Sequence, residues 1–141
     1  MIQALLDTNV LLDFLNKRKF HAEASLILDL AASGKMRACV SAHEMTTLAY
    51  FLEKEMKNSR ECREILKQLF SLVRILAVDK EILENAVYSQ MEDFEDAVLE
   101  AVCLKNGVQT IVTRNVKDFV QSKVEAVNPS LFLELMTNSL S

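Results

Sequence analysis

The sequence predicts an α/β protein, a three-layer α/β/α sandwich with a central parallel sheet of about five strands. Two observations lead to this prediction. Short apolar stretches alternate along the chain with longer stretches whose apolar residues recur every three or four positions. The short stretches also lack the in–out alternation of a half-exposed strand, so they fit a sheet that is covered on both faces.

Short apolar stretches bounded by polar residues or glycine are the predicted strands. The first ends at Asp7, and the second lies between Gly34 and Ser41. Another is continuously apolar except for Arg74, as expected for a strand buried on both faces. In chain order, the predicted strands are residues 2–6, 36–40, 73–78, 110–113 and 124–127.

Stretches with helical periodicity separate and follow these strands. Several have recognisable ends: Ser41 and Glu44 match a capping box, and Gly107 suits the left-handed position after a helix. Ser59 and Asp79 are predicted N-caps. In chain order, the predicted helices are residues 10–15, 21–33, 42–57, 60–71, 80–88, 93–106 and 131–136.

Length and composition limit the possible classes of protein. The 141 residues predict a single domain, residues 1–141, with its last few residues frayed. Only two glycines and one proline occur, which excludes the glycine-rich phosphate loops of dinucleotide-binding and P-loop proteins. The net charge of −4 is not the basic footprint of a nucleic-acid binder, so a nucleic-acid substrate would need bound cations or a local basic rim.

The cysteines and the apolar runs predict a cytoplasmic protein. Cys39, Cys62 and Cys103 are far apart and form no CxxC pair, so reduced thiols are expected instead of disulfides or a zinc site. No apolar run reaches the roughly 18 residues of a membrane span, and the chain opens on a strand without a signal-like segment. We expect no membrane association.

Acidic residues from four segments are predicted to meet at one edge of the sheet. The carboxyl ends of parallel strands share an edge, and ligands of open α/β sheets bind there. Asp7 follows the first strand, and Glu44 begins the helix after the second. Asp118 lies in the turn after the fourth strand. Asp96 lies near the start of the helix that leads into that strand, so it points back to the same edge.

Each acid also has a purely structural interpretation. Asp7 and Asp93 can serve as helix N-caps, and Glu44 can do no more than close the capping box. Asp118 can be an ordinary turn residue. Asp96 is the hardest to explain as surface charge, because it lies on an apolar helix beside Ala97 and Val98.

A carboxylate rim of this kind suits a divalent cation. Mg²⁺ and Mn²⁺ prefer carboxylate oxygens and keep several waters, and such an ion activates water and neutralises phosphate oxygens. We expect Asp7, Asp96 and Asp118 to bind the metal, with Glu44 as a fourth catalytic acid. The side chains expected to support these acids or contact the substrate are Asn9, Thr47, Asp93, Thr113, Arg114 and Asn115.

The assembled motifs resemble the PIN domain, in particular the VapC-type toxin ribonucleases. They are LLDTNVLLDFL at residues 5–15, DFEDAVLEAV at 93–102 and TIVTRNVKDF at 110–119. The resemblance implies a PIN-like fold and a metal-dependent endoribonuclease acting on RNA. It also implies a homodimer and a small antitoxin protein as partner.

Carried over residue by residue, the resemblance assigns Asp7, Asp96 and Asp118 to three family aspartates. At a fourth position the chain departs from the family pattern. Many relatives have an acid six residues after the serine that starts the helix, which is Ser41 here. Thr47 stands there, and Asn115 stands at another position that is often acidic. Glu44, one helical turn before Thr47, either substitutes for the missing acid or only caps the helix.

Three hypotheses follow from the sequence. The first is the Mg²⁺- or Mn²⁺-dependent ribonuclease, as the toxin of a toxin–antitoxin pair. The second, suggested by Thr47 and Asn115, is an inactive PIN-fold module that binds protein or RNA. The third is an aspartyl phosphatase or receiver-like domain, which the lack of a DxD pair at Asp7 disfavours.

Overall fold

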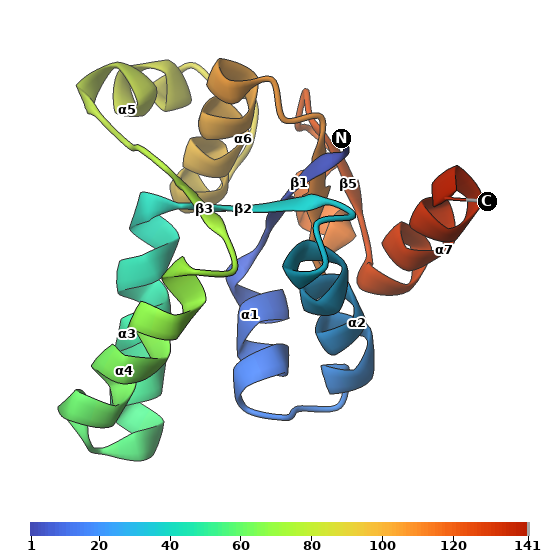
Figure 1. The fold of residues 1–141 in the computed structure, drawn as a ribbon. Coiled ribbons are helices and arrows are strands. Elements are labelled where there is room, and N and C mark those ends of the chain that lie inside the picture. The colour runs from blue at the N-terminus through green and yellow to red at the C-terminus, as the bar shows by residue number, and fades with distance from the viewer. Residues whose placement is uncertain (141) are drawn as a thin grey trace.

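The computed structural model describes residues 1–140 and contains the predicted parallel sheet. Five strands are arranged in the order β3-β2-β1-β4-β5, and every neighbouring pair is parallel. Helices lie on both sides of the sheet (Figure 1), so the predicted α/β/α class is confirmed. The strands are β1 (Gln3–Leu6), β2 (Arg37–Ser41), β3 (Arg74–Leu76), β4 (Thr110–Val112) and β5 (Glu125–Val127).

The helices follow the predicted order with small shifts at their ends. They are α1 (Thr8–Leu15), α2 (His21–Ala32), α3 (Ala42–Met56), α4 (Ser59–Phe70), α5 (Lys80–Val87), α6 (Phe94–Asn106), the 3₁₀ helix η1 (Val116–Phe119) and α7 (Pro129–Leu140).

Besides shifts of one or two residues at other strand and helix ends, three features differ from the prediction. Asn58, not Ser59, is the N-cap of α4, because the Asn58 Oδ1 accepts a hydrogen bond from the Glu61 N–H at 3.1 Å. Part of the predicted turn after β4 is wound into η1. Helix α7 continues past Met136 to Leu140. Ser141, at the end of the tail predicted to fray, lies outside the described residues.

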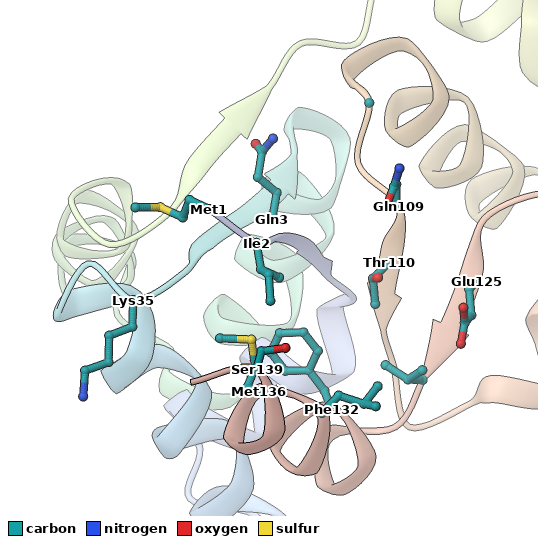
Figure 2. A pocket seen from close by; sticks show the side chains of 13 residues that line it. Met1, Ile2, Gln3, Lys35, Gln109, Thr110, Glu125, Phe132, Met136 and Ser139 are labelled. Carbon is teal, nitrogen blue, oxygen red and sulfur yellow. The ribbon is translucent and has the colours of Figure 1, made fainter. Parts of the chain in front are cut away.

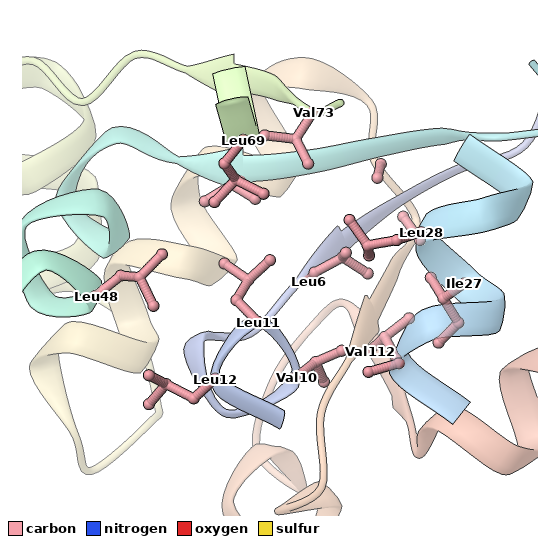
Figure 3. Close-up of a cluster of buried hydrophobic side chains, with 14 of the residues drawn as sticks. Leu6, Val10, Leu11, Leu12, Ile27, Leu28, Leu48, Leu69, Val73 and Val112 are labelled. Atoms are coloured by element: carbon pink, nitrogen blue, oxygen red, sulfur yellow. The ribbon is translucent and has the colours of Figure 1, made fainter. Parts of the chain in front are cut away.

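Two hydrophobic cores lie on opposite faces of the sheet, because successive strand residues point to opposite sides. Leu6 of β1 and Val112 of β4 face α1, α2 and α7. Figure 3 shows these two residues beside Val10 of α1 and Ile27 of α2. The neighbouring residues Leu5 and Ile111 face α5 and α6. Burial on both faces explains why the strands read as continuous apolar runs.

The strand order places a topological switch point between β1 and β4. The chain proceeds from β1 outward to β2 and β3, then returns through α5 and α6 to β4 on the other side of β1. Residues just beyond the carboxyl ends of β1 and β4 therefore flank the crevice in which open α/β sheets bind ligands. Asp7 and Thr113 occupy these two places, and the Asp7 N–H donates to the Val112 carbonyl oxygen at 2.9 Å.

A pocket of about 650 Å³ lies at the opposite edge of the sheet. Its lining includes the first residues of three strands, Gln3, Thr110 and Glu125, together with Phe132 and Met136 of α7 (Figure 2). These are the amino ends of the strands, so this pocket is separate from the acidic edge. Among the described residues, no helix is both long and apolar enough to cross a membrane.

Candidate metal and nuclease site

Asp7 is held rigidly between β1 and α1. It is the N-cap of α1, where its Oδ1 accepts a hydrogen bond from the Thr8 N–H at 2.7 Å. Its Oδ2 accepts from the Thr113 hydroxyl at 2.8 Å and from the Asn9 amide at 3.3 Å. Burial raises the pKa of the Asp7 carboxyl, while the bonds from Thr113 and Thr8 act in the opposite direction. Asp7 is therefore both an N-cap and a partly buried carboxylate at the switch point.

Asn9, Thr113 and Asn115 form the support behind Asp7. The Asn9 amide also donates to the Thr113 hydroxyl at 3.2 Å, and its Oδ1 accepts from the Arg114 N–H at 3.2 Å. The Asn115 backbone N–H donates to Thr113 Oγ1 at 3.1 Å. Thr113 is fully buried, so it orients Asp7 and offers no surface to a phosphate. Asn115 joins this hydrogen-bond network only through its backbone N–H, and the residue as a whole is exposed.

Glu44 lies beneath the site and not on its surface. It closes the predicted capping box, with its Oε1 accepting from the Ser41 N–H at 2.9 Å. Its Oε2 accepts a longer bond from the Thr8 hydroxyl at 3.4 Å. Only 1 % of its surface is exposed, and burial together with the charge of Asp7 raises its pKa well above the usual 4.5. Glu44 thus connects α3 to α1 from the interior.

Asp96 and Asp118 lie on two other segments, and each is electrostatically coupled to Asp7. Asp96 lies in the first turn of α6, where Asp93 is the N-cap and accepts from the Asp96 N–H at 3.0 Å. Burial raises the pKa of Asp96 to about 7, and the negative charges of Asp7 and Asp93 add to this effect. Asp118, an exposed residue of η1, raises the pKa of both Asp7 and Asp96. Asp7, Asp96 and Asp118 form what we call the acidic rim.

Glu95 is a nearby acid that the sequence analysis missed. It is exposed, and its Oε1 accepts a hydrogen bond from the Thr47 hydroxyl of α3 at 3.0 Å. The His43 ring links the same two helices, with Nε2 3.3 Å from the Glu95 backbone oxygen and Nδ1 2.6 Å from Ser41 Oγ. The motif around Asp96 contained Glu95, but sequence alone could not predict that α3 would lie against the start of α6.

The Arg114 side chain contacts α1 and the segment that follows it. Its guanidinium forms an ion pair with Asp13 of α1 and lies over the Phe20 ring, with Cζ 5.4 Å from the ring centre. Asp13 is buried, with 1 % of its surface exposed. The Arg114 side chain therefore fastens the loop after β4 to α1, and Asp13 is structural and interior rather than a residue of the helix surface.

The acidic rim fits a hydrated divalent cation better than a closed metal cage. Among the described side chains, no three His, Cys, Asp or Glu residues already form a group that could hold a metal by themselves. Mg²⁺ commonly needs only one or two carboxylates and retains several waters, unlike structural zinc. The negative charge of Asp7 raises the pKa of Asp96, because the two ionised carboxylates repel each other. A cation bound to both carboxylates would relieve this repulsion.

Comparison with known families identifies the domain. A family model described as the PIN domain matches residues 3–117, most of the chain. The chain belongs to the PIN domain family. The matched range contains Asp7, Glu44 and Asp96 and ends directly before Asp118. No curated protein matches the sequence.

Solved structures share the PIN fold of this chain at low sequence identity. A toxin–antitoxin complex from Klebsiella pneumoniae has 24% identity and a TM-score of 0.67, over 89% of this chain and 97% of its own. VapBC2 from Rickettsia felis, bound to a promoter DNA fragment, has 18% identity and a TM-score of 0.70, with coverages of 90% and 98%. The Mycobacterium tuberculosis toxin VapC20, which cleaves the sarcin–ricin loop, has 23% identity and a TM-score of 0.59, with coverages of 77% and 86%.

Proposed function

We propose that this PIN domain is a Mg²⁺- or Mn²⁺-dependent endoribonuclease that hydrolyses RNA phosphodiester bonds. The observation that carries the proposal is the acidic rim. Asp7, Asp96 and Asp118 come from three separate segments at the carboxyl edge of the sheet. The charge of Asp118 raises the pKa of Asp7 and of Asp96, and the charge of Asp7 raises the pKa of Asp96. Clustering of perturbed carboxylates in such a crevice is typical of catalytic sites.

In this proposal each residue near the rim has a distinct role. Asp7 and Asp96 bind the cation, with Asp118 completing the set. Asn9 and Thr113 fix the Asp7 carboxylate through the hydrogen bonds at 3.3 and 2.8 Å, and this kind of support tunes metal affinity. When bound, the cation would lower the pKa of a water and neutralise phosphate oxygens. It would also offset the repulsion between RNA and a chain of net charge −4.

Cleavage of RNA by the purified protein tests the proposal. We expect cutting of labelled RNA with Mn²⁺ or Mg²⁺, no cutting in EDTA, and loss of at least 100-fold with Asp7→Asn or Asp96→Asn. Asp29→Asn is the matched control, because Asp29 is an exposed aspartate of α2. Equal cutting in EDTA, or undiminished cutting by Asp7→Asn, would sink the proposal.

The alternative is a PIN fold without catalytic activity that acts by binding protein or RNA. Thr47 in place of an acid, and the absence of a ready three-residue metal group among the described side chains, favour this alternative. Calorimetric titration with Mn²⁺ separates the two. Binding that Asp96→Asn abolishes would argue against the alternative, whereas RNA binding without metal binding would support it. The receiver-like hypothesis is set aside, because the chain belongs to the PIN family.

We further propose that the protein is the toxin of a toxin–antitoxin pair and forms a homodimer. Two of the three solved structures described above are toxin–antitoxin or VapBC complexes. Exposed apolar side chains suited to protein contacts are present on α3 and just after α5: Tyr50, Phe51 and Tyr88. Light scattering should report a mass of about twice 16.0 kDa. A short open reading frame beside the gene, whose product blocks cleavage, would identify the antitoxin.

A further inference from the structure

Helix α3 presents a hydroxyl group, not a carboxylate, to the surface beside the acidic rim. Its two candidate residues there are Glu44 and Thr47. Glu44 is 1 % exposed, and its oxygens accept bonds from Ser41 and Thr8, so it does not face a ligand in solvent. Thr47 is partly exposed, and its hydroxyl donates a 3.0 Å hydrogen bond to Glu95 Oε1.

Glu95 is positioned by contacts on two of its groups. Thr47 binds its carboxylate, and the His43 ring lies 3.3 Å from its backbone oxygen. Glu95 also directly precedes Asp96 in the first turn of α6. Its partner Thr47 lies one helical turn after Glu44, which accepts a hydrogen bond from Thr8, the residue after Asp7. These contacts place Glu95 at the same edge as the rim. An exposed glutamate otherwise samples many rotamers, so a hydrogen bond from another helix restricts it to one side of α6.

We propose that Glu95 is the fourth carboxylate of the metal site and that Thr47 is the positioning residue that directs it there. This inference rests on the proposed nuclease function. Glu95 supplies from α6 the charge that α3 does not supply, while one oxygen bonded to Thr47 leaves the other free for the cation or its waters. A metal ion that keeps several waters tolerates a carboxylate acting through a water as well as one bound directly.

The first test measures metal binding apart from activity. In calorimetric titrations with MnCl₂, Glu95→Gln should weaken Mn²⁺ binding on the order of 10-fold, because a carboxylate that supports a metal site typically contributes that much. Glu92→Gln is the matched control, an exposed glutamate just before α6. The glutamine at position 95 can still accept the Thr47 bond, and unchanged unfolding temperatures in EDTA would show that both variants fold. Equal Mn²⁺ affinity of Glu95→Gln and the control would overturn the inference.

The second test moves the carboxylate back to α3. Because Thr47 Oγ1 touches the Glu95 carboxylate, a glutamate side chain at position 47 can reach the same space. The double variant Glu95→Gln with Thr47→Glu should recover most of the lost Mn²⁺ affinity and RNA cleavage. Thr47→Val keeps Glu95 but removes its hydrogen bond, so we expect a smaller loss of affinity, about 3-fold, with an unchanged unfolding temperature in EDTA.

These measurements separate failure of this inference from failure of the nuclease proposal. If the unmodified protein neither binds Mn²⁺ nor cuts RNA, the nuclease proposal fails and takes this inference with it. If it does both, and Glu95→Gln does both equally well, only the role of Glu95 is wrong. If Glu95→Gln loses Mn²⁺ affinity and the double variant does not recover it, the role of Glu95 as a metal carboxylate stands. The role of Thr47 as its positioning residue is then wrong.

Discussion

At the scale of single residues, the environment gives chemically similar carboxyl groups different properties. Glu44 is buried and bonded to Ser41 and Thr8, whereas Asp96 lies partly exposed at the start of α6. Burial is the first cause of the raised pKa of both groups, and the charge of Asp7 adds to it in both. Only Asp96 is reachable from solvent, which suits it for a ligand and Glu44 for internal support.

The raised pKa of Asp96 predicts a pH-dependent stability. Its pKa of about 7 in the folded protein exceeds the ordinary 3.8, so between these values the folded state binds more protons than the unfolded chain. Stability contributed by this group is therefore lost as the pH rises from about 4 to about 7. Without metal, Asp96→Asn should unfold at a temperature roughly 3–6 °C above the unmodified protein at pH 8, and at a similar temperature at pH 4.

Scanning calorimetry in EDTA at both pH values checks this prediction. Asp29 is an exposed aspartate, so Asp29→Asn should show the same difference in unfolding temperature between pH 8 and pH 4 as the unmodified protein. Partial exposure of Asp96 lets solvent screen its charge, which is why only a modest shift is expected. A lower unfolding temperature for Asp96→Asn at pH 8 would contradict the assigned direction.

The buried position of Glu44 predicts that its volume and hydrogen bonds matter to stability more than its charge. Glu44→Ala should lower the free energy of unfolding by about 2–3 kcal/mol, since it removes a capping bond and leaves buried donors unpaired. Glu44→Gln should cost less than about 1 kcal/mol, because the amide oxygen can still accept from the Ser41 N–H. Urea unfolding measures both, and similar losses for the two variants would refute this role.

At the scale of elements, the loop after β4 is fixed to α1 at two points. The Arg114 N–H donates to Asn9 Oδ1 at 3.2 Å, and the Arg114 guanidinium pairs with Asp13 farther along the helix. This loop leads into η1, which contains Asp118. The position of Asp118 relative to Asp7 therefore depends on contacts that involve neither residue.

The pair between Asp13 and Arg114 should be strongly coupled. Arg114→Ala should destabilise the protein by about 3 kcal/mol, because it leaves the Asp13 carboxylate buried without its cation. Adding Asp13→Asn removes that stranded charge, so the double variant should cost about 1–2 kcal/mol less than the sum of the single changes.

A double-mutant cycle by urea unfolding gives the coupling energy of this pair. The surface pair of Lys80 and Glu84, spaced one turn apart on α5, is the matched control and should couple by less than about 0.5 kcal/mol. Equal coupling in the two cycles would mean that Asp13 is as well solvated as a surface acid.

At the scale of the whole molecule, the order of strands brings distant segments to one edge. Asp7 and Asp96 are far apart in sequence, and the return of the chain from β3 to β4 across β1 places them together. A cation bound between them would stabilise only the folded chain, since the unfolded chain has no such site.

Mn²⁺ should therefore raise the thermal stability of the protein. At a free concentration 100 times its Kd, a single bound ion adds about 2.7 kcal/mol, which corresponds to roughly 10 °C for a domain of this size. Differential scanning fluorimetry with and without MnCl₂ measures the shift. Asp7→Asn should abolish most of it and Asp29→Asn none, and an equal shift in all three proteins would place the ion elsewhere.

The sequence determined the architecture of this protein to a large extent. Apolar periodicity predicted the strands and helices, and parallel strands must end at a common edge, so the segments carrying Asp7, Asp96 and Asp118 could be placed together. Local caps were also readable: Asp79 and Asp93 cap their helices as their side-chain chemistry indicated. Ser59 was wrongly chosen over Asn58, because both residues suit an N-cap and only the backbone conformation separates them.

Only the tertiary structure decided how the side chains at that edge are used. Three features depend on where one element packs against another. They are the burial of Glu44, the ion pair of Arg114 with Asp13, and the hydrogen bond from Thr47 to Glu95. Periodicity fixes which face of a helix is buried, but not which polar group of a neighbouring helix that face meets. The acidic edge followed from local pattern and topology, whereas its individual contacts followed from packing between segments that are distant in sequence.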